Sequence, residues 1–127
     1  MTARHWATAG ALLAGLAVAL GAFGAHGLRN YLDAADLATF DTGARYQMYH
    51  GLALLAVAWM AAKAPSRATD VAGWAFVAGT VVFSGSLYLL TLGGLRWMGA
   101  VAPLGGVSFL VGWGALALAA RRLPSQG

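Results

Sequence analysis

Hydrophobic residues fall into four long blocks along the chain, and the charged residues lie at the edges of these blocks. The uncharged stretches cover residues 7–28, 46–62, 71–95 and 97–120. A helix that crosses a bilayer needs about 20 mainly apolar residues, with a range of about 17–25. The pattern therefore predicts membrane-spanning helices over approximately residues 6–26, 42–63, 71–92 and 98–120.

The second block is the shortest, with 17 uncharged residues. It can extend N-terminally through residues 40–43 at the level of the lipid headgroups, and the Lys63 side chain can snorkel at the other end. Membrane-spanning strands fit less well, because they alternate apolar and polar residues and form barrels of at least about eight strands. We therefore interpret all four blocks as helices.

The segments between the blocks are short. Residues 63–67 form a polar link, Asp70 is predicted to cap the third helix, and Gly93 and Gly94 are predicted to end it. Short links force consecutive helices to lie antiparallel and side by side. The predicted fold is an all-α membrane protein, a compact four-transmembrane-helix bundle with up-down-up-down order and short loops, in a single domain over residues 1–127.

Composition supports a membrane location. Charged residues make up 9% of the chain and hydrophobic residues 60%, whereas a soluble domain has about 25% charged residues. The absence of cysteine excludes disulfides, thiolate catalysis and Cys-ligated metal centres. The net charge of +4 does not indicate nucleic-acid binding, because the basic residues flank apolar blocks instead of gathering on one face.

The distribution of Lys and Arg predicts the orientation in the membrane. With the N-terminus in the cytoplasm, five basic residues lie inside and three outside. We therefore expect a multi-pass protein of the bacterial inner membrane with both termini cytoplasmic. A cleaved secretory signal is the alternative for the N-terminus, although its apolar run exceeds the roughly 7–15 residues of such a signal.

Small residues form a face on the first and fourth predicted helices. Because lipid gives helices no hydrophobic reason to associate, membrane helices pack closely through small residues. We interpret these faces as contacts within the bundle, with a hinge or a homo-oligomer surface as the alternative. The residues are Gly10, Ala14, Ala17, Gly21 and Gly24 in the first helix, and Gly99, Ala102, Gly105, Gly106, Gly112 and Gly114 in the fourth.

Polar residues at membrane depth are concentrated in the second and third predicted helices. Asp33 or Asp36 can cap the second helix, and Asp41 and Arg45 are spaced to form an ion pair along it. A polar stripe on the third helix is spaced by four, four and three residues: Thr80, Ser84, Tyr88 and Thr91. We predict that the two helices face each other through their polar sides, since unpaired polar groups in lipid are costly.

The candidate functional residues are the members of this polar cluster, which His26 can join from the end of the first helix. A histidine within a membrane helix is by default a functional hypothesis, and its pKa lies near physiological pH. The candidates are His26, Asp41, Arg45, Tyr46, Gln47, Tyr49, His50, Ser84 and Tyr88.

Three roles are open for the cluster: hydrogen bonds that hold the helices together, handling of protons or a solute, and metal binding. Two histidines without Glu or Cys make a poor metal site, so we assign neither a metal nor a cofactor. Catalytic motifs are absent, because Ser84 is not in a GxSxG elbow and no Walker-type lysine follows the glycines. We therefore expect a non-enzymatic protein.

Five sequence blocks resemble a small bacterial membrane-protein family, domain of unknown function 423. They are GAFGAHGL at 21–28, FDTGARYQMYHGLALL at 40–55, FSGSLYLL at 83–90, APLGG at 102–106 and GW at 112–113. The blocks keep their order and cover nearly the whole chain. The resemblance implies four transmembrane helices in the inner membrane and no established activity. Gly51 and Ala102 depart from the family pattern, in which Ala and Thr are common at these places.

The sequence thus predicts an inner-membrane protein of unknown molecular function that acts through helix–helix contacts. The partners we expect are membrane lipids and either a second copy or another membrane protein, and not nucleic acid. The alternative is a small transporter or proton-linked pathway through the polar cluster. A pathway requires a water-filled route to the cluster, whereas a structural role requires polar groups that satisfy one another.

Overall fold

The computed structural model describes residues 1–125, and these are almost entirely helical. The all-helical prediction is thus confirmed. The elements are α1 (Ala3–His26), α2 (Ala34–Lys63), α3 (Arg67–Leu92), the short 3₁₀ helix η1 (Arg96–Ala100) and α4 (Ala102–Ala120).

The helix ends follow local sequence signals. Thr2, Asp33 and Ser66 cap α1, α2 and α3, each accepting a hydrogen bond from a backbone N–H in the first turn. Asp70 was expected to cap α3, but the helix begins one turn earlier because the Ser66 hydroxyl reaches the Thr69 amide. Gly94, two residues after the end of α3, has a φ of +67°, which a residue without a Cβ adopts readily.

The fourth predicted span, 98–120, differs from the structure at its start. Residues 96–100 form the 3₁₀ turn η1, and the α-helix begins at Ala102 with Pro103 in its first turn. Proline is tolerated there because the first N–H groups of a helix have no partner within it. The observed α4 is therefore the shortest of the α-helices, with 19 residues.

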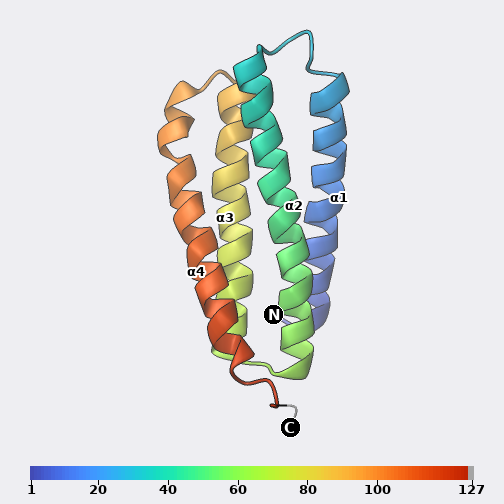
Figure 1. Cartoon of the computed structure of the whole chain (residues 1–127), viewed down its shortest axis with the longest axis vertical. Coiled ribbons are helices and arrows are strands. Elements are labelled where there is room, and N and C mark those ends of the chain that lie inside the picture. Colours follow the sequence, from blue (N-terminus) through green and yellow to red (C-terminus); the bar gives the residue numbers. More distant parts are fainter. Residues whose placement is uncertain (126–127) are drawn as a thin grey trace.

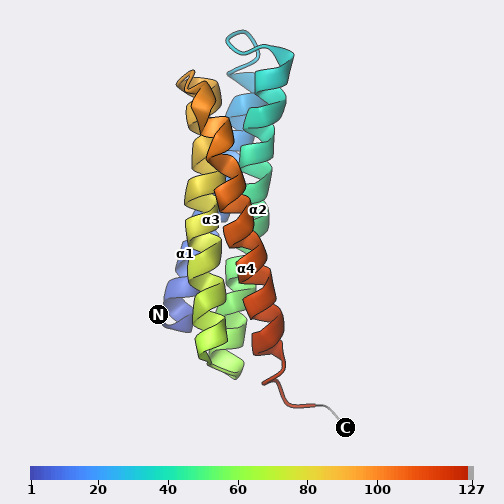
Figure 2. The ribbon, with the colours of Figure 1, turned by 90° about the vertical axis from the view of Figure 1, so that its left-hand side faces the viewer.

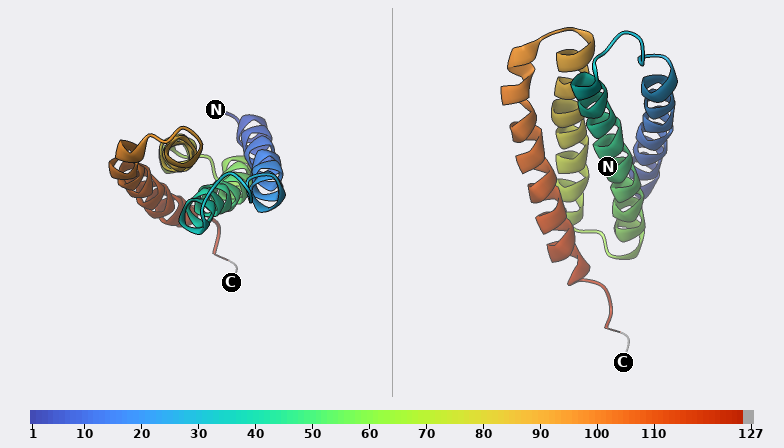
Figure 3. Two further views of the ribbon diagram at one scale, coloured as in Figure 1. Left: turned by 90° about the horizontal axis from the view of Figure 1, so that it is seen from above. Right: turned by 45° about the horizontal axis from the view of Figure 1, so that its top comes forward.

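Neighbouring helices in the chain lie side by side and run in opposite directions (Figure 1). The N-terminus and the C-terminal tail lie at the same end of the molecule, where α2 ends and α3 begins (Figure 2). Seen from above, α1 and α4 lie on opposite sides, with α2 and α3 between them (Figure 3). Helices α2 and α3 therefore contribute most of the buried residues.

Glycines let the helix backbones approach closely at two crossings. A Cβ on Gly10 of α1 would stand 2.6 Å from the carbonyl oxygen of Gly51 in α2. A Cβ on Gly105 of α4 would stand 2.4 Å from the backbone nitrogen of Phe83 in α3. Such short backbone contacts maximise the dispersion attraction on which helix association in lipid depends.

The predicted small-residue faces are used in part. In α1, Gly10, Ala17 and Gly24 are buried, whereas nothing lies within 4 Å of a Cβ placed on Gly21. In α4 the buried small residues of the predicted face are Ala102, Gly105 and Gly112, while Gly106 and Gly114 have open space beside them.

The core is a cluster of apolar side chains contributed by all four α-helices. Trp6 from α1 is fully buried, and its ring occupies the space that a side chain on Gly73 of α3 would need. Its Nε1 atom is the one buried side-chain polar atom without a hydrogen-bond partner among the described residues. The other core residues are Ala53, Leu54, Val57, Ala58, Ala72, Phe76 and Phe109.

Large apolar side chains also cover much of the outer surface, including Leu12, Val81 and Leu110, which are each at least 66% exposed. Three helical segments are long and apolar enough to cross a membrane: Ala3–His26, Arg67–Leu92 and Arg96–Ala120. Helix α2, at 30 residues, is long enough but more polar, since it carries most of the candidate cluster.

Adjacent glycines in α4 provide a matched test of the close approach. We expect Gly105→Ala to destabilise the fold by about 1–3 kcal/mol, because the new methyl group meets the Phe83 backbone. Gly106→Ala should be neutral or stabilising by up to about 1 kcal/mol, because its methyl group meets open space and alanine favours helix. Thermal unfolding in detergent, followed by circular dichroism, measures both. Equal effects of the two variants would contradict the observed crossing.

Candidate functional site

The buried part of the polar cluster is built around Gln47, which links three helices. Its side-chain Nε2 donates to the backbone carbonyl of Leu13 in α1 at 2.9 Å. Its Oε1 accepts a hydrogen bond from the Tyr88 hydroxyl of α3 at 2.7 Å. Both ends of the amide are therefore occupied by other helices, and the side chain is only 3% exposed.

A second hydrogen bond joins α2 and α3 one turn above Gln47. The Ser84 hydroxyl donates to the backbone carbonyl of Gly43 at 2.7 Å. Gly43 fits here because a Cβ on it would stand 2.9 Å from the Tyr88 ring. The missing side chain thus lets α3 bring both Ser84 and Tyr88 within reach of α2.

His50 is held on both ring nitrogens. Nδ1 lies 2.7 Å from the Tyr46 carbonyl, one turn back in α2, and Nε2 lies 3.1 Å from the indole Nε1 of Trp113 in α4. A carbonyl only accepts and an indole N–H only donates, so these partners assign a neutral imidazole with its proton on Nδ1. The ring also stacks on Phe109, with centroids 3.5 Å apart and planes 5° from parallel.

Sequence reasoning placed some polar residues correctly and missed others. Ser84 and Tyr88 reach α2 as expected, but the Thr80 and Thr91 hydroxyls donate to carbonyls of their own helix. Two inter-helix donors on α4 were not singled out: Trp113, and Ser108, whose hydroxyl donates to the Ala75 carbonyl at 2.7 Å. Their only sequence signal was a polar atom within an apolar block.

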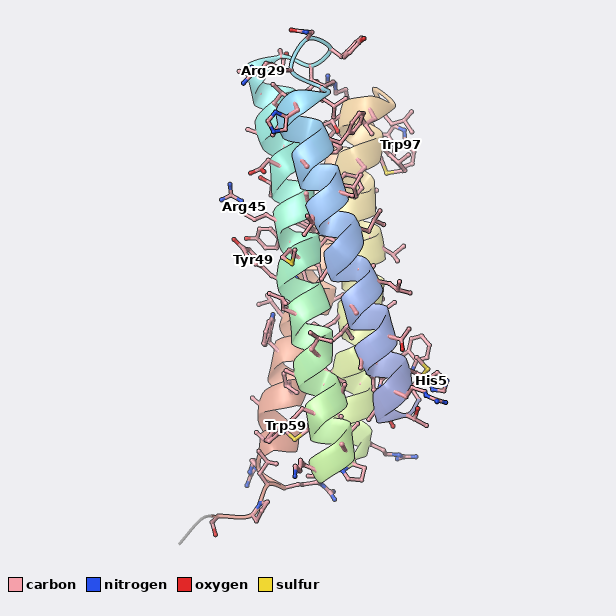
Figure 4. All side chains as sticks on the ribbon, turned by 90° about the vertical axis from the view of Figure 1, so that its right-hand side faces the viewer. His5, Arg29, Arg45, Tyr49, Trp59 and Trp97 are labelled. Atoms are coloured by element: carbon pink, nitrogen blue, oxygen red, sulfur yellow. The ribbon has the colours of Figure 1, made fainter. Side chains whose placement is uncertain are left out.

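Four of the predicted cluster residues lie on the outside of α2. Asp41 and Arg45 form an ion pair at 2.6 Å, with side chains 53% and 62% exposed. Tyr46 and Tyr49 are partly exposed, and Figure 4 shows Arg45 and Tyr49 projecting from the same edge of α2. His26 is exposed at the end of α1, and no hydrogen bond joins it to the cluster within residues 1–125. The cluster therefore divides into an inner and an outer part.

A groove of about 350 Å³ opens between α2 and α4 on the outer surface. We call it the α2–α4 groove. His50 and Gly106 contribute to its lining, and aromatic side chains form most of its wall. The wall residues are Tyr46, Tyr49, Phe83, Phe109, Leu110 and Trp113.

A salt bridge closes the end of the molecule where α2 begins. Both terminal guanidinium nitrogens of Arg96 in η1, Nη1 and Nη2, donate to the Asp36 carboxylate, at 2.7 and 2.8 Å. These hydrogen bonds lower the pKa of the Asp36 carboxyl below its usual 3.8; partial burial opposes the shift and the positive charge of Arg96 adds to it. The pair fixes η1, and with it the start of α4, against α2.

The described part of the chain holds no group of three His, Asp or Glu side chains that could bind a metal ion together. What the geometry does define is a helical protein with an apolar exterior and an apolar core, in which the polar groups of the inner cluster are paired by hydrogen bonds. This is the arrangement of a helical membrane protein.

Comparison with known proteins agrees with this class. The model of the family described as "Protein of unknown function (DUF423)" matches residues 20–106. The chain belongs to this family, as its sequence blocks suggested, and the family name states no molecular function.

Relatives of the chain are named as membrane proteins. A UPF0382 membrane protein of Staphylococcus saprophyticus is 50% identical over 82% of this chain and 86% of its own. The UPF0382 membrane protein YwdK of Bacillus subtilis is 46% identical over 87% and 91% of the two chains. The UPF0382 inner membrane protein YgdD of Escherichia coli is 42% identical over 100% of this chain and 97% of its own. No solved structure matches the chain.

The linkage through Gln47 predicts a measurable coupling between α2 and α3. Gln47→Leu should cost about 1 kcal/mol, because it removes two inter-helix hydrogen bonds that average about 0.6 kcal/mol each in membrane proteins. A double-mutant cycle with Tyr88→Phe should give a coupling energy of about 0.6 kcal/mol. Thr91→Val is the control, since its hydroxyl bonds its own helix. Unfolding in mixed micelles measures the cycle, and equal coupling for Tyr88 and Thr91 would contradict the link.

The lowered pKa of Asp36 predicts how stability depends on pH. The native carboxyl has the lower pKa, so the ion pair contributes fully above about pH 4, near the unfolded pKa. This contribution is lost as the pH falls through the native pKa. The gap in melting temperature between the wild type and Asp36→Asn should therefore close in acid. Arg96→Gln should show the same gap, and the double variant should be no less stable than either single one.

Proposed function

We propose that the chain is a non-enzymatic, multi-pass protein of the bacterial inner membrane with four spans and both termini in the cytoplasm. It acts by contact between helices, with a second copy or with another membrane protein. The proposal rests on one observation: the inner polar groups at mid-helix are paired with each other or with backbone, while the outward faces are apolar.

The position of α2 supports a fourth span. Its 30 residues extend for about 45 Å, longer than the roughly 30 Å hydrocarbon core. It lies between α1 and α3, and its inward polar groups Gln47 and His50 find partners on the neighbouring helices. About 20 residues counted back from Lys63 reach Gly43, which leaves Asp33 and Asp36 outside the hydrocarbon.

The distribution of charge supports cytoplasmic termini. Lys and Arg residues at the end that carries the termini outnumber those at the other end by five to three. The five are Arg4, Lys63, Arg67, Arg121 and Arg122, and the three are Arg29, Arg45 and Arg96.

The outer face of α4 is the surface we propose for contact with another helix. Val107, Val111 and Leu118 are more than half exposed, and Gly114 beside them has nothing within 4 Å of its Cβ position. Within the described chain α4 packs mainly on α3, so this face meets only lipid in a monomer.

The alternative, a transporter or proton-linked pathway, is less well supported by the geometry. Gln47, His50 and Ser84 are at most 4% exposed, and the hydrogen bonds at His50 use both of its ring nitrogens. Protonation of His50 would place an N–H against the Trp113 N–H, so a relay through this ring must first break that bond.

Single cysteines test the proposal cleanly, because the native chain has none. Val111→Cys should form a disulfide-linked dimer in native membranes on mild oxidation if two copies meet through α4. Val81→Cys, on an exposed face of α3, is the control and should remain monomeric. A cross-link of Val111→Cys to another protein would instead identify a partner. No cross-link of either kind would contradict contact through this face.

The same set of variants tests the interior and the orientation. Ser84→Cys should resist a water-soluble thiol reagent, whereas labelling would favour a wet pathway. Arg122→Cys should be labelled only after the reagent gains access to the cytoplasmic side. Labelling of Arg122→Cys in intact cells would overturn the proposed orientation.

A further inference from the structure

Three outward side chains of α2, spaced by four residues, form a stripe that leads from the α2–α4 groove up the helix and toward α1. Tyr49 lines the groove, and Arg45 lies one turn above it. Asp41 lies one turn above Arg45, forms an ion pair with it and lines a separate pocket between α1 and α2. Figure 4 shows Arg45 above Tyr49 on the same edge of the helix. Three chemically different side chains thus follow one another at intervals of one helical turn: an aromatic ring, a cation and an anion.

The depth of this stripe matches the headgroup region of the membrane. In the four-span arrangement proposed above, on which this inference rests, the hydrocarbon begins near Gly43. Asp41 and Arg45 flank that level, and a long Arg side chain can reach outward to the headgroups. The groove below them lies beside the acyl chains, with His50 at about the middle of α2.

The order of charges along α2 then indicates which kind of lipid occupies the groove. We propose that the α2–α4 groove binds one acyl chain of a phospholipid whose headgroup carries a phosphate and a primary ammonium, as in phosphatidylethanolamine. From the bilayer outward such a lipid presents an acyl chain, then an anionic phosphate, then an ammonium. The protein presents in the same order an apolar groove, the Arg45 guanidinium and the Asp41 carboxylate.

Unused hydrogen-bonding capacity in the Asp41–Arg45 ion pair, directly above the groove-lining Tyr49, supports this assignment. The Arg45 guanidinium has five N–H donors, and the bond to Asp41 at 2.6 Å engages one of its terminal nitrogens. The Asp41 carboxylate likewise has lone pairs beyond that bond, and both side chains are more than half exposed. A phosphate and an ammonium bridging the pair satisfy both groups without separating them.

The groove itself has room for an acyl chain because of Gly106. Nothing lies within 4 Å of a Cβ placed on this glycine, although it contributes to the groove lining. A large side chain there fills the groove from α4 without displacing the helix backbone. The same change at Gly15 of α1, which also has open space, leaves the groove intact.

Native mass spectrometry of delipidated protein tests the proposal. The probe is an equimolar mixture of phosphatidylethanolamine and phosphatidylglycerol with identical acyl chains. We expect the wild type to retain phosphatidylethanolamine over phosphatidylglycerol by about tenfold, the factor that one charge-assisted hydrogen bond of roughly 1.4 kcal/mol supplies. Phosphatidylcholine, whose ammonium has no N–H donor, should bind less well than phosphatidylethanolamine by a similar factor.

Variants separate the parts of the site. Asp41→Asn, an exposed change that leaves the bundle intact, should abolish the preference for phosphatidylethanolamine over phosphatidylglycerol. Arg45→Gln should weaken retention of both lipids. Gly106→Leu should remove the bound lipid, whereas Gly15→Leu and Arg4→Gln should bind as the wild type does. Circular dichroism of each variant confirms that it is folded.

Three results would overturn the proposal: no preference in the wild type, an unchanged preference in Asp41→Asn, or full lipid retention in folded Gly106→Leu. If Gly106→Leu instead lowers the oligomeric mass and leaves lipid binding unchanged, a second copy occupies the groove and the lipid site is refuted. The cysteine cross-links and labelling described above are independent of lipid retention, so a failure of the four-span or association proposal is recognised separately.

Discussion

The structure depends on satisfying polar groups where water is absent, and Gln47 is where this constraint acts most strongly. An amide in hydrocarbon costs several kcal/mol if it is left unpaired. Gln47 avoids this cost only when α1 presents the Leu13 carbonyl and α3 presents the Tyr88 hydroxyl. One side chain thereby fixes the rotation of three helices about their axes. Apolar packing alone tolerates several such rotations.

Glycines make these hydrogen bonds possible by setting the distance between helices. The contact between Gly10 and Gly51 brings α1 against α2 near Gln47, and Gly43 lets α3 approach with Ser84 and Tyr88. Glycine contacts and polar hydrogen bonds fix different aspects of the packing. Close backbone contact at the glycines fixes the distance between helices, and the hydrogen bonds fix how the helices are aligned along their axes. Without the close glycine contacts the polar groups are too far apart to bond, and without the hydrogen bonds the glycine faces are not held in alignment.

Much of this architecture can be predicted from the sequence, because hydrophobic length and helix caps are local signals. The helical blocks, an aspartate cap at Asp33 or Asp36 and the Asp41–Arg45 pair all follow from spacings within one helix, and the structure selects Asp33 as the cap. The bonds from Trp113 to His50 and from Arg96 to Asp36 could not be predicted in this way. They join residues about 60 positions apart and depend on the tilt and rotation of α4, which no local pattern encodes.

The division of α2 into an inner and an outer polar face explains why its function is hard to infer from composition. Gln47 and His50 point inward and are paired, whereas Asp41, Arg45 and Tyr49 point outward. Outward charges are tolerable only near the headgroups, so their height along α2 limits how deeply the helix is placed. In the proposed four-span arrangement, that placement lets Lys63 reach the opposite headgroups and puts the α2–α4 groove beside the acyl chains. In this proposed arrangement, the same outward charges that lower the hydropathy of α2 thus set its depth in the membrane.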